Sequence, residues 1–319
     1  MNIVSKIKRR ILNDIHSSAL FRRKNSLQFL RLALFYKERQ QLLNQIKYED
    51  NLHLHIPTAE GLLKWYSRNF FLGEKVVAQC KQIIENEKHI IEKLTMDLES
   101  GNIPPEFITN PFHQAMLDPY LTIDSPLIKL GLHPSILKAI GNYFGMLPVL
   151  TGIYLLYSPN KGMFKKSSQL FHLDMHDRKC MKIFIYINDV DLDGGPLTAI
   201  PGNYSALIER KLHYKDRYVL NSGDLTSRVE DNLIESIVPK EKFIAFTGEA
   251  GSALFIDTDR CFHYGSRKAS KPRIALQYYY ETPFGFGYPP DFSNEKLFTL
   301  RKLAKETDSR IEKLVLGDH

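Results

Sequence analysis

The stretch KIFIYINDVDLDGGPLTAIPGNY, residues 182–204, decides the fold class. It opens with KIFIYIN (182–188), a run of β-branched and aromatic residues that is typical of a strand buried on both faces. A second short apolar run, 197–200, ends at Pro201 and Gly202, which mark a turn. Short strands separated by Gly, Pro and Asp turns predict a mainly β core, built as a sandwich or barrel.

Similar segments lie on both sides of this stretch, and helices flank them. The alternation of residue types predicts strands, and apolar side chains spaced near 3.6 residues predict amphipathic helices. The strands are expected at 153–157, 252–257 and 273–280, and the helices at 25–47, 74–100 and 295–316.

These elements divide the chain into four regions. We predict a basic helical arm at 1–47, a helical region packing on the core at 48–147, the β core at 148–285 and a C-terminal helix at 286–319. Residues 205–247 show little periodicity. A segment of that length between core strands predicts a functional lid.

The composition excludes several classes of protein. Hydrophobic residues make up 43% and charged residues 25% of the 319 residues, a profile of a globular chain with a sizeable core. No apolar run reaches the roughly 18 residues of a membrane span, and no secretory leader pattern follows the basic N-terminus. The three cysteines, Cys80, Cys180 and Cys261, are odd in number and lack C-x-x-C spacing, which excludes a disulfide framework or zinc ribbon. We therefore expect core cysteines in a cytoplasmic protein.

The net charge of +7 is concentrated at one end of the chain. Residues 1–40 hold ten Lys or Arg and two acidic residues, a balance of +8, so the other 279 residues sum to −1. Such an arm can bind an anionic lipid surface, nucleic acid or an acidic partner. It can equally be a solvated helix with a few apolar anchors, which is the interpretation we favour. The near-neutral body argues against a nucleic-acid-binding domain.

The residues with the clearest chemistry lie in FHLDMHDRKC, residues 171–180. His172 and Asp174 are two residues apart, so on a strand their side chains share a face. One more imidazole would complete a two-His-one-carboxylate metal site. Such a site leaves coordination positions of the metal open, as non-haem Fe(II) oxygenases require. His263, in RCFHYG, is the candidate for that ligand. His176 would lie some 13 Å from His172 on a continuous strand, so we favour a surface position for it.

Arg273 opens the strand RIALQYYY, ten residues after His263. An inward-facing Arg offers a fixed fork for a carboxylate, and an oxygenase that uses a dicarboxylic oxoacid needs such a clamp near its metal. Ser266 lies between these two residues and could add a hydroxyl.

At this point the chain resembles the phytanoyl-CoA dioxygenase-like family of Fe(II)/2-oxoglutarate-dependent oxygenases. The resemblance covers roughly residues 150–281, under half of the chain. It rests on FHLD (171–174), the opening stretch 182–204, GSALFIDTDRCFHYGS (251–266) and KPRIAL (271–276).

The resemblance implies a double-stranded β-helix, the jelly-roll core of cupin-like proteins, with N-terminal and C-terminal helices outside it. It also implies Fe(II) on His172, Asp174 and His263, with the distal carboxylate of 2-oxoglutarate on Arg273 and O₂ as the second cosubstrate. The sequence departs from the family at Asn203-Tyr204 and at Gly265. These departures affect the secondary 2-oxoglutarate contacts, for which Ser266 and Tyr154 are our candidates.

The implied activity is hydroxylation of an unactivated C–H bond in a small or lipid-like metabolite, with 2-oxoglutarate converted to succinate and CO₂. Desaturation, cyclisation and epimerisation can use the same site. Two other functions remain open: a nucleic-acid or protein demethylase of the same superfamily, and a catalytically silent jelly-roll binding protein.

Three further residues have simple structural interpretations. Asp257 could orient His263, but an Asp at the end of a strand is also ordinary turn chemistry, which we favour. Trp65 is expected to anchor a helix, and Tyr278 is expected in the core.

Overall fold

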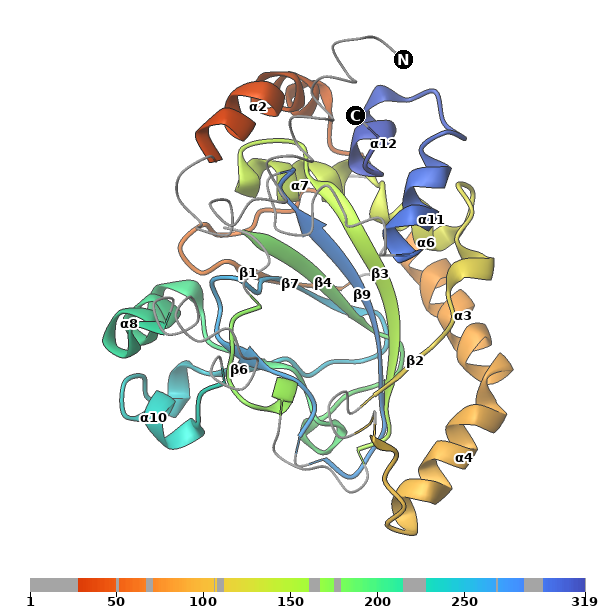
Figure 1. Ribbon diagram of the computed structural model, residues 1–319, viewed down its shortest axis with the longest axis vertical. Coiled ribbons are helices and arrows are strands. Elements are labelled where there is room, and N and C mark those ends of the chain that lie inside the picture. Colours follow the sequence, from red (N-terminus) through yellow and green to blue (C-terminus); the bar gives the residue numbers. More distant parts are fainter. Residues whose placement is uncertain are drawn as a thin grey trace.

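Two antiparallel sheets pack together, with helices around them (Figure 1). The computed structural model describes residues 28–49, 52–66, 71–105, 107, 112–160, 167–174, 179–214, 228–267, 269–283 and 295–318. The larger sheet has the strand order β1-β7-β4-β9-β3-β2, and the smaller sheet has the order β6-β5-β8. The larger sheet consists of β1 (Leu62–Tyr66), β2 (His113–Gln114), β3 (Val149–Ser158), β4 (Cys180–Tyr186), β7 (Ser252–Asp257) and β9 (Arg273–Glu281), and the smaller of β5 (Thr198–Ala199), β6 (Ile244–Ala245) and β8 (His263–Tyr264).

The helices fall into two groups in Figure 1, one on the side of the larger sheet, from which α4 extends outward beyond α3, and one beside the smaller sheet. The first group consists of α2 (Gln28–Gln45), α3 (Phe71–Asn86), α4 (Lys88–Glu99), α6 (Pro126–Gly131), α7 (Pro134–Phe144), α11 (Glu295–Leu303) and α12 (Arg310–Val315), and the second of α8 (Gly202–Leu212) and α10 (Asp231–Glu235). None of the helices in the described ranges combines the length and the apolar composition needed to cross a bilayer.

The central strand β4 confirms the interpretation of the opening stretch, because all its residues are buried. It pairs with β7 on one side and β9 on the other. Side chains alternate between faces along a strand. Ile183 and Ile185 of β4 therefore pack in the core against the helices, whereas Phe184 and Tyr186 pack toward the smaller sheet.

The face of the larger sheet toward the smaller one is unusually polar at β9. Arg273, Gln277 and Glu281 lie on this inner face and are all buried. Leu276 and Tyr278 lie on the outer face and pack against the helices, as the sequence predicts for the tyrosine. Buried polar side chains in such a row point to a ligand-binding interior, because burying them is costly unless they are paired.

The expected mainly β architecture with helices outside is present. The particular strand winding of a double-stranded β-helix stays a prediction. The lid expected at 205–247 contributes α8, α10 and β6, while 215–227 lie outside the described residues.

Two of the expected helices are each divided into two. The helix predicted at 74–100 breaks at Glu87, whose carboxylate lies 2.6 Å from His113 Nε2 and accepts the Met116 N–H. The helix predicted at 295–316 ends at Leu303 and restarts after Ser309, whose hydroxyl accepts the Glu312 N–H as a cap. In both places a polar tertiary or capping contact overrides helical periodicity.

The region expected to be helical, 48–147, also supplies an edge strand to the larger sheet. Trp65 lies in β1 opposite Ala253 of β7, so the interpretation of Trp65 as a helix anchor is wrong. The LLKWY sequence of β1 is short, and its pairing with β7 is a long-range contact that local periodicity does not report.

Residues 1–27, which carry most of the charge of the predicted basic arm, lie outside the described residues. One arginine of the arm is not solvated. Arg39, on α2, is buried and donates hydrogen bonds to the carbonyls of Leu147, Pro148 and Leu314. It joins α2 to the start of β3 and to α12.

Asp257, at the end of β7, is fully buried among several hydrogen-bond donors. Its carboxylate accepts the Tyr143 hydroxyl at 2.8 Å and the Cys180 and Asp259 N–H groups. Burial still dominates and raises the pKa of Asp257 to about 6. The ionised carboxylate is therefore less favourable in the folded chain than in the unfolded one.

We predict that the Asp257→Asn variant gains stability relative to the wild type as pH rises from 4 to 7. A carboxyl pKa raised by about two units stabilises the folded chain below pH 4, and this contribution is lost as pH rises through 6. The difference in free energy of unfolding should change by about 2 kcal/mol over this range, measured by urea unfolding. The exposed Asp308→Asn control should show no comparable change. A difference that is independent of pH would contradict the burial argument.

Candidate metal centre

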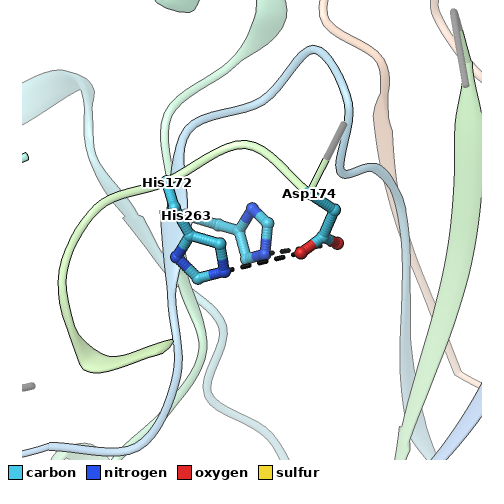
Figure 2. A group of neighbouring side chains, drawn as sticks. All are labelled: His172, Asp174 and His263. Atoms are coloured by element: carbon cyan, nitrogen blue, oxygen red, sulfur yellow. Dashed lines mark ion pairs between the residues drawn. The ribbon is translucent and has the colours of Figure 1, made fainter. Parts of the chain in front are cut away.

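His172 and His263 face one another on two neighbouring backbone segments. Their backbones form an antiparallel bridge, with N–H to carbonyl distances of 3.0 and 3.1 Å. Asp174 follows two residues after His172, and its N–H donates to the Thr258 carbonyl. The turn after β7 and the start of β8 therefore hold all three residues in place. Figure 2 shows the two imidazoles and the Asp174 carboxylate directed toward one another.

The three side chains converge on one point. His172 Nε2 lies 3.5 Å from Asp174 Oδ1, and His263 Nε2 lies 3.8 Å from Asp174 Oδ2. In the described part of the chain this is the one group of three His, Cys, Asp or Glu whose donor atoms all lie within 4.8 Å of one another. Two ligand atoms that each lie some 2.1 Å from a metal, at right angles to one another, are about 3 Å apart. Small rotations of the three side chains would therefore bring their donor atoms to the spacing of a metal site. The residues fit a metal ion such as iron.

Backbone carbonyls orient both imidazoles. Nδ1 of His172 lies 2.8 Å from the Leu170 carbonyl, and Nδ1 of His263 lies 3.0 Å from the Cys261 carbonyl. Each Nδ1 therefore carries the proton and donates it, which leaves the Nε2 lone pair directed toward Asp174. The Cys261 carbonyl, and not Asp257, orients His263.

The charges of the site suit metal binding. Burial and the neighbouring His172 lower the pKa of His263 to about 3, so this imidazole is neutral at pH 7. Burial alone would raise the pKa of Asp174, but the Lys182 ammonium outweighs burial and holds this pKa well below its usual range. A neutral imidazole and an ionised carboxylate are the forms that ligate metals.

Lys182 is the feature of the site that the motifs did not indicate. Its ammonium lies 2.7 Å from Asp174 Oδ2 and 3.9 Å from the centre of the Tyr279 ring. Burial works against the ammonium, but Asp174 raises the pKa of Lys182 well above its usual value. The available signal was a single lysine at the start of the otherwise apolar run KIFIYIN.

Arg273 lies at the other end of the inner face of β9, six residues before Tyr279. Its Nη1 donates to the Gly195 carbonyl at 3.0 Å, while its buried Nε has no hydrogen-bond partner among the described residues. Burial lowers the pKa of Arg273, which Tyr186 partly offsets. A buried guanidinium with a free donor is suited to receive an anion.

Ser266 is held next to Arg273 by the same carbonyl. Its hydroxyl lies 3.1 Å from the Gly195 carbonyl and 2.5 Å from Asn160 Oδ1. Gly195 has φ of +64°, and a Cβ there would lie 2.4 Å from Ser266 Oγ, so only glycine fits. Asn160 had no signal in the sequence, because its contact is with Ser266, 106 residues later in the chain.

Tyr154 lies on the inner face of β3 with its ring centre 4.7 Å from that of Tyr279. Burial raises the pKa of Tyr154 to about 12. The structure therefore places Tyr154 near Lys182 rather than beside Arg273. His176 lies outside the described residues.

Comparisons with known proteins found structural similarity only. No family model matches the sequence, and no curated protein matches it. Three similar solved structures are EctD from S. alaskensis with 2-oxoglutarate and 5-hydroxyectoine, the non-heme alpha ketoglutarate dependent carbocyclase SnoK and the epimerase SnoN, both from nogalamycin biosynthesis. Each is 14% identical, with TM-scores of 0.47, 0.43 and 0.39. The matches cover 74%, 81% and 70% of this chain and 79%, 88% and 78% of those chains, respectively.

We predict that Asp174→Ala abolishes tight binding of a divalent metal. Loss of second-layer partners alone typically costs 10–100-fold in metal affinity, so loss of a ligand should cost at least about 100-fold. Calorimetric titration of the metal-free protein with Co(II) measures this directly. The exposed Asp124→Ala variant is the control and should bind as the wild type does. Equal affinity in Asp174→Ala and wild type would remove Asp174 from the metal centre.

Proposed function

We propose that the chain is an Fe(II)/2-oxoglutarate-dependent dioxygenase. The observation that carries this proposal is the convergence of His172, Asp174 and His263 in one group, in which both imidazoles are buried. Two imidazoles and one carboxylate leave three positions of an octahedral metal open, which suits a bidentate cosubstrate and O₂. These three residues would be the metal ligands.

Arg273 supports 2-oxoglutarate as the cosubstrate. Its guanidinium is buried, and its Nε lacks a partner among the described side chains and backbone groups. A dicarboxylate bound to the metal through one end would bring its other carboxylate to this donor. The paired charges would then offset the cost of burying the guanidinium.

Ser266 and Tyr154 would have different roles around this cosubstrate. Ser266 and Arg273 share the Gly195 carbonyl, so the hydroxyl would fix the position of the guanidinium and lie near the distal carboxylate. Tyr154 packs against Tyr279 with tilted rings on the other side of the site, where the two rings would line the space for the substrate.

The reaction we propose is hydroxylation of an unactivated C–H bond in a small or lipid-like metabolite, with conversion of 2-oxoglutarate to succinate and CO₂. When bound, Fe(II) and 2-oxoglutarate supply the oxidising chemistry with O₂. The chain orients the metal through the carbonyl-anchored imidazoles, neutralises the distal carboxylate at Arg273 and limits water access through burial. The aromatic walls near Lys182 favour an apolar reacting group.

We predict that anaerobic addition of Fe(II) and 2-oxoglutarate to the metal-free protein produces a visible metal-to-oxoacid charge-transfer band. The band should saturate at one iron per chain, because the described residues form one such group. Asp174→Ala serves as the control and should give no band. Iron binding without a band in the wild type would exclude 2-oxoglutarate as the metal-chelating cosubstrate and favour a binding protein.

Arg273→Ala should weaken the apparent affinity for 2-oxoglutarate by at least about 30-fold. Removing one partner of a buried charge pair costs about 2–5 kcal/mol, and 2 kcal/mol corresponds to about 30-fold. The measurement is the 2-oxoglutarate dependence of the charge-transfer band, with Fe(II) affinity measured separately. Lys271→Ala removes an exposed cation two residues away and should leave both affinities unchanged. An unaltered 2-oxoglutarate affinity in Arg273→Ala would exclude the clamp.

A further inference from the structure

Lys182 contacts a ligand of the candidate metal centre from inside the sandwich. Its Nζ lies 2.7 Å from Asp174 Oδ2, and its side chain is 7% exposed. The other oxygen, Oδ1, lies 3.5 Å from His172 Nε2. Oδ2 also lies 3.8 Å from His263 Nε2, so this oxygen has the ammonium and one imidazole beside it, whereas Oδ1 lies beside His172.

The sheet fixes the position of this ammonium. Lys182 pairs with Tyr279 of β9 and with Ile256 of β7, so its strand is held on both sides. The Tyr279 ring lies under the ammonium at 3.9 Å, and the Tyr279 hydroxyl donates to Gln277 Oε1 at 2.9 Å. A cation between a carboxylate and an aromatic face has little freedom to move away.

Folding stability alone is a weak explanation for this pair. Taking two charges out of water is costly, and replacing a buried ion pair with apolar side chains is often neutral or stabilising. A methionine has similar length and would continue the apolar character of β4. A charged pair at this position therefore points to a role at the metal centre.

We propose that Lys182 is a positioning residue that restricts Asp174 to coordination through one oxygen. A carboxylate can bind a metal through one oxygen or chelate it through both. The ion pair engages Oδ2 and leaves Oδ1, which lies beside His172, to bind the metal. Three positions then stay open, as the proposed function requires, whereas a chelating Asp174 would leave two. This inference rests on the proposed function and adds Lys182 to its site.

The number of water molecules on a bound Mn(II) ion tests the proposal without turnover. Mn(II) takes the same ligand types and is stable in air, and broadening of its paramagnetic resonance lines in ¹⁷O-enriched water counts bound waters. We expect three waters in the wild type and two in Lys182→Met, because Oδ2 becomes free to chelate. Lys182→Arg keeps a cationic donor at this position, so it should bind Mn(II) with three waters, as the wild type does. Lys179→Met removes a neighbouring lysine that contacts the Tyr143 carbonyl instead, and should show three.

The outcomes separate this inference from the proposed function. Three waters in Lys182→Met, or two in the wild type, would overturn the role of Lys182 and leave the metal centre intact. No Mn(II) binding in the wild type would instead remove the proposed function and this inference together. If Lys182→Met does not fold, Lys182→Gln is measured with the same expectation, because its amide ends one atom short of the ammonium position.

Discussion

The site depends on a carboxylate buried between two sheets. Asp174 is 12% exposed, and an isolated ionised carboxylate at such a position would take up a proton. It stays ionised because the Lys182 ammonium lies 2.7 Å from Oδ2, and this charge holds the pKa of Asp174 well below the usual range in spite of burial. The neighbouring residues thus maintain a negative charge where a divalent cation can use it.

Strand register places those neighbours. β4 lies in the middle of the larger sheet, and the alternation of its side chains directs Lys182 inward while Ile183 packs against the helices. The same alternation on β9 directs Arg273 and Tyr279 inward. A shift of either strand by one residue would turn its polar residues toward the helices and its apolar residues toward the site. The apolar packing of the outer face therefore also specifies the polar inner face.

Much of this arrangement could be predicted from the sequence. H-x-D spacing, the later His263 and the inward Arg273 depend on local periodicity and on the types of residue that bind metals and carboxylates. The roles of Asn160 and of the edge strand with Trp65 could not be found in this way, because they arise from contacts between distant segments. The role of Lys182 could not be found either, because its contact with Asp174, eight residues earlier, depends on the path of the chain in space and not on periodicity. Polar contacts also divided two helices that periodicity had joined, at Glu87 and before Ser309. Each of these differences between the predicted and the observed structure is caused by a contact that periodicity does not report. At Ser309 the contact is a local helix cap.

The turn after β7 connects the metal centre to the helical layer. Asp257 accepts hydrogen bonds from Tyr143 of α7 and from the Cys180 N–H at the start of β4, and its own N–H donates to the Gly61 carbonyl beside β1. One residue later, the Thr258 carbonyl accepts the Asp174 N–H. The same turn continues to the Cys261 carbonyl that orients His263. Two of the three candidate ligands thus depend on one short segment, and that segment is anchored by a carboxylate with a pKa raised by burial. A disturbance of the helix–sheet contact at Tyr143 would therefore reach the ligands through the backbone, without any change in the residues of the site itself.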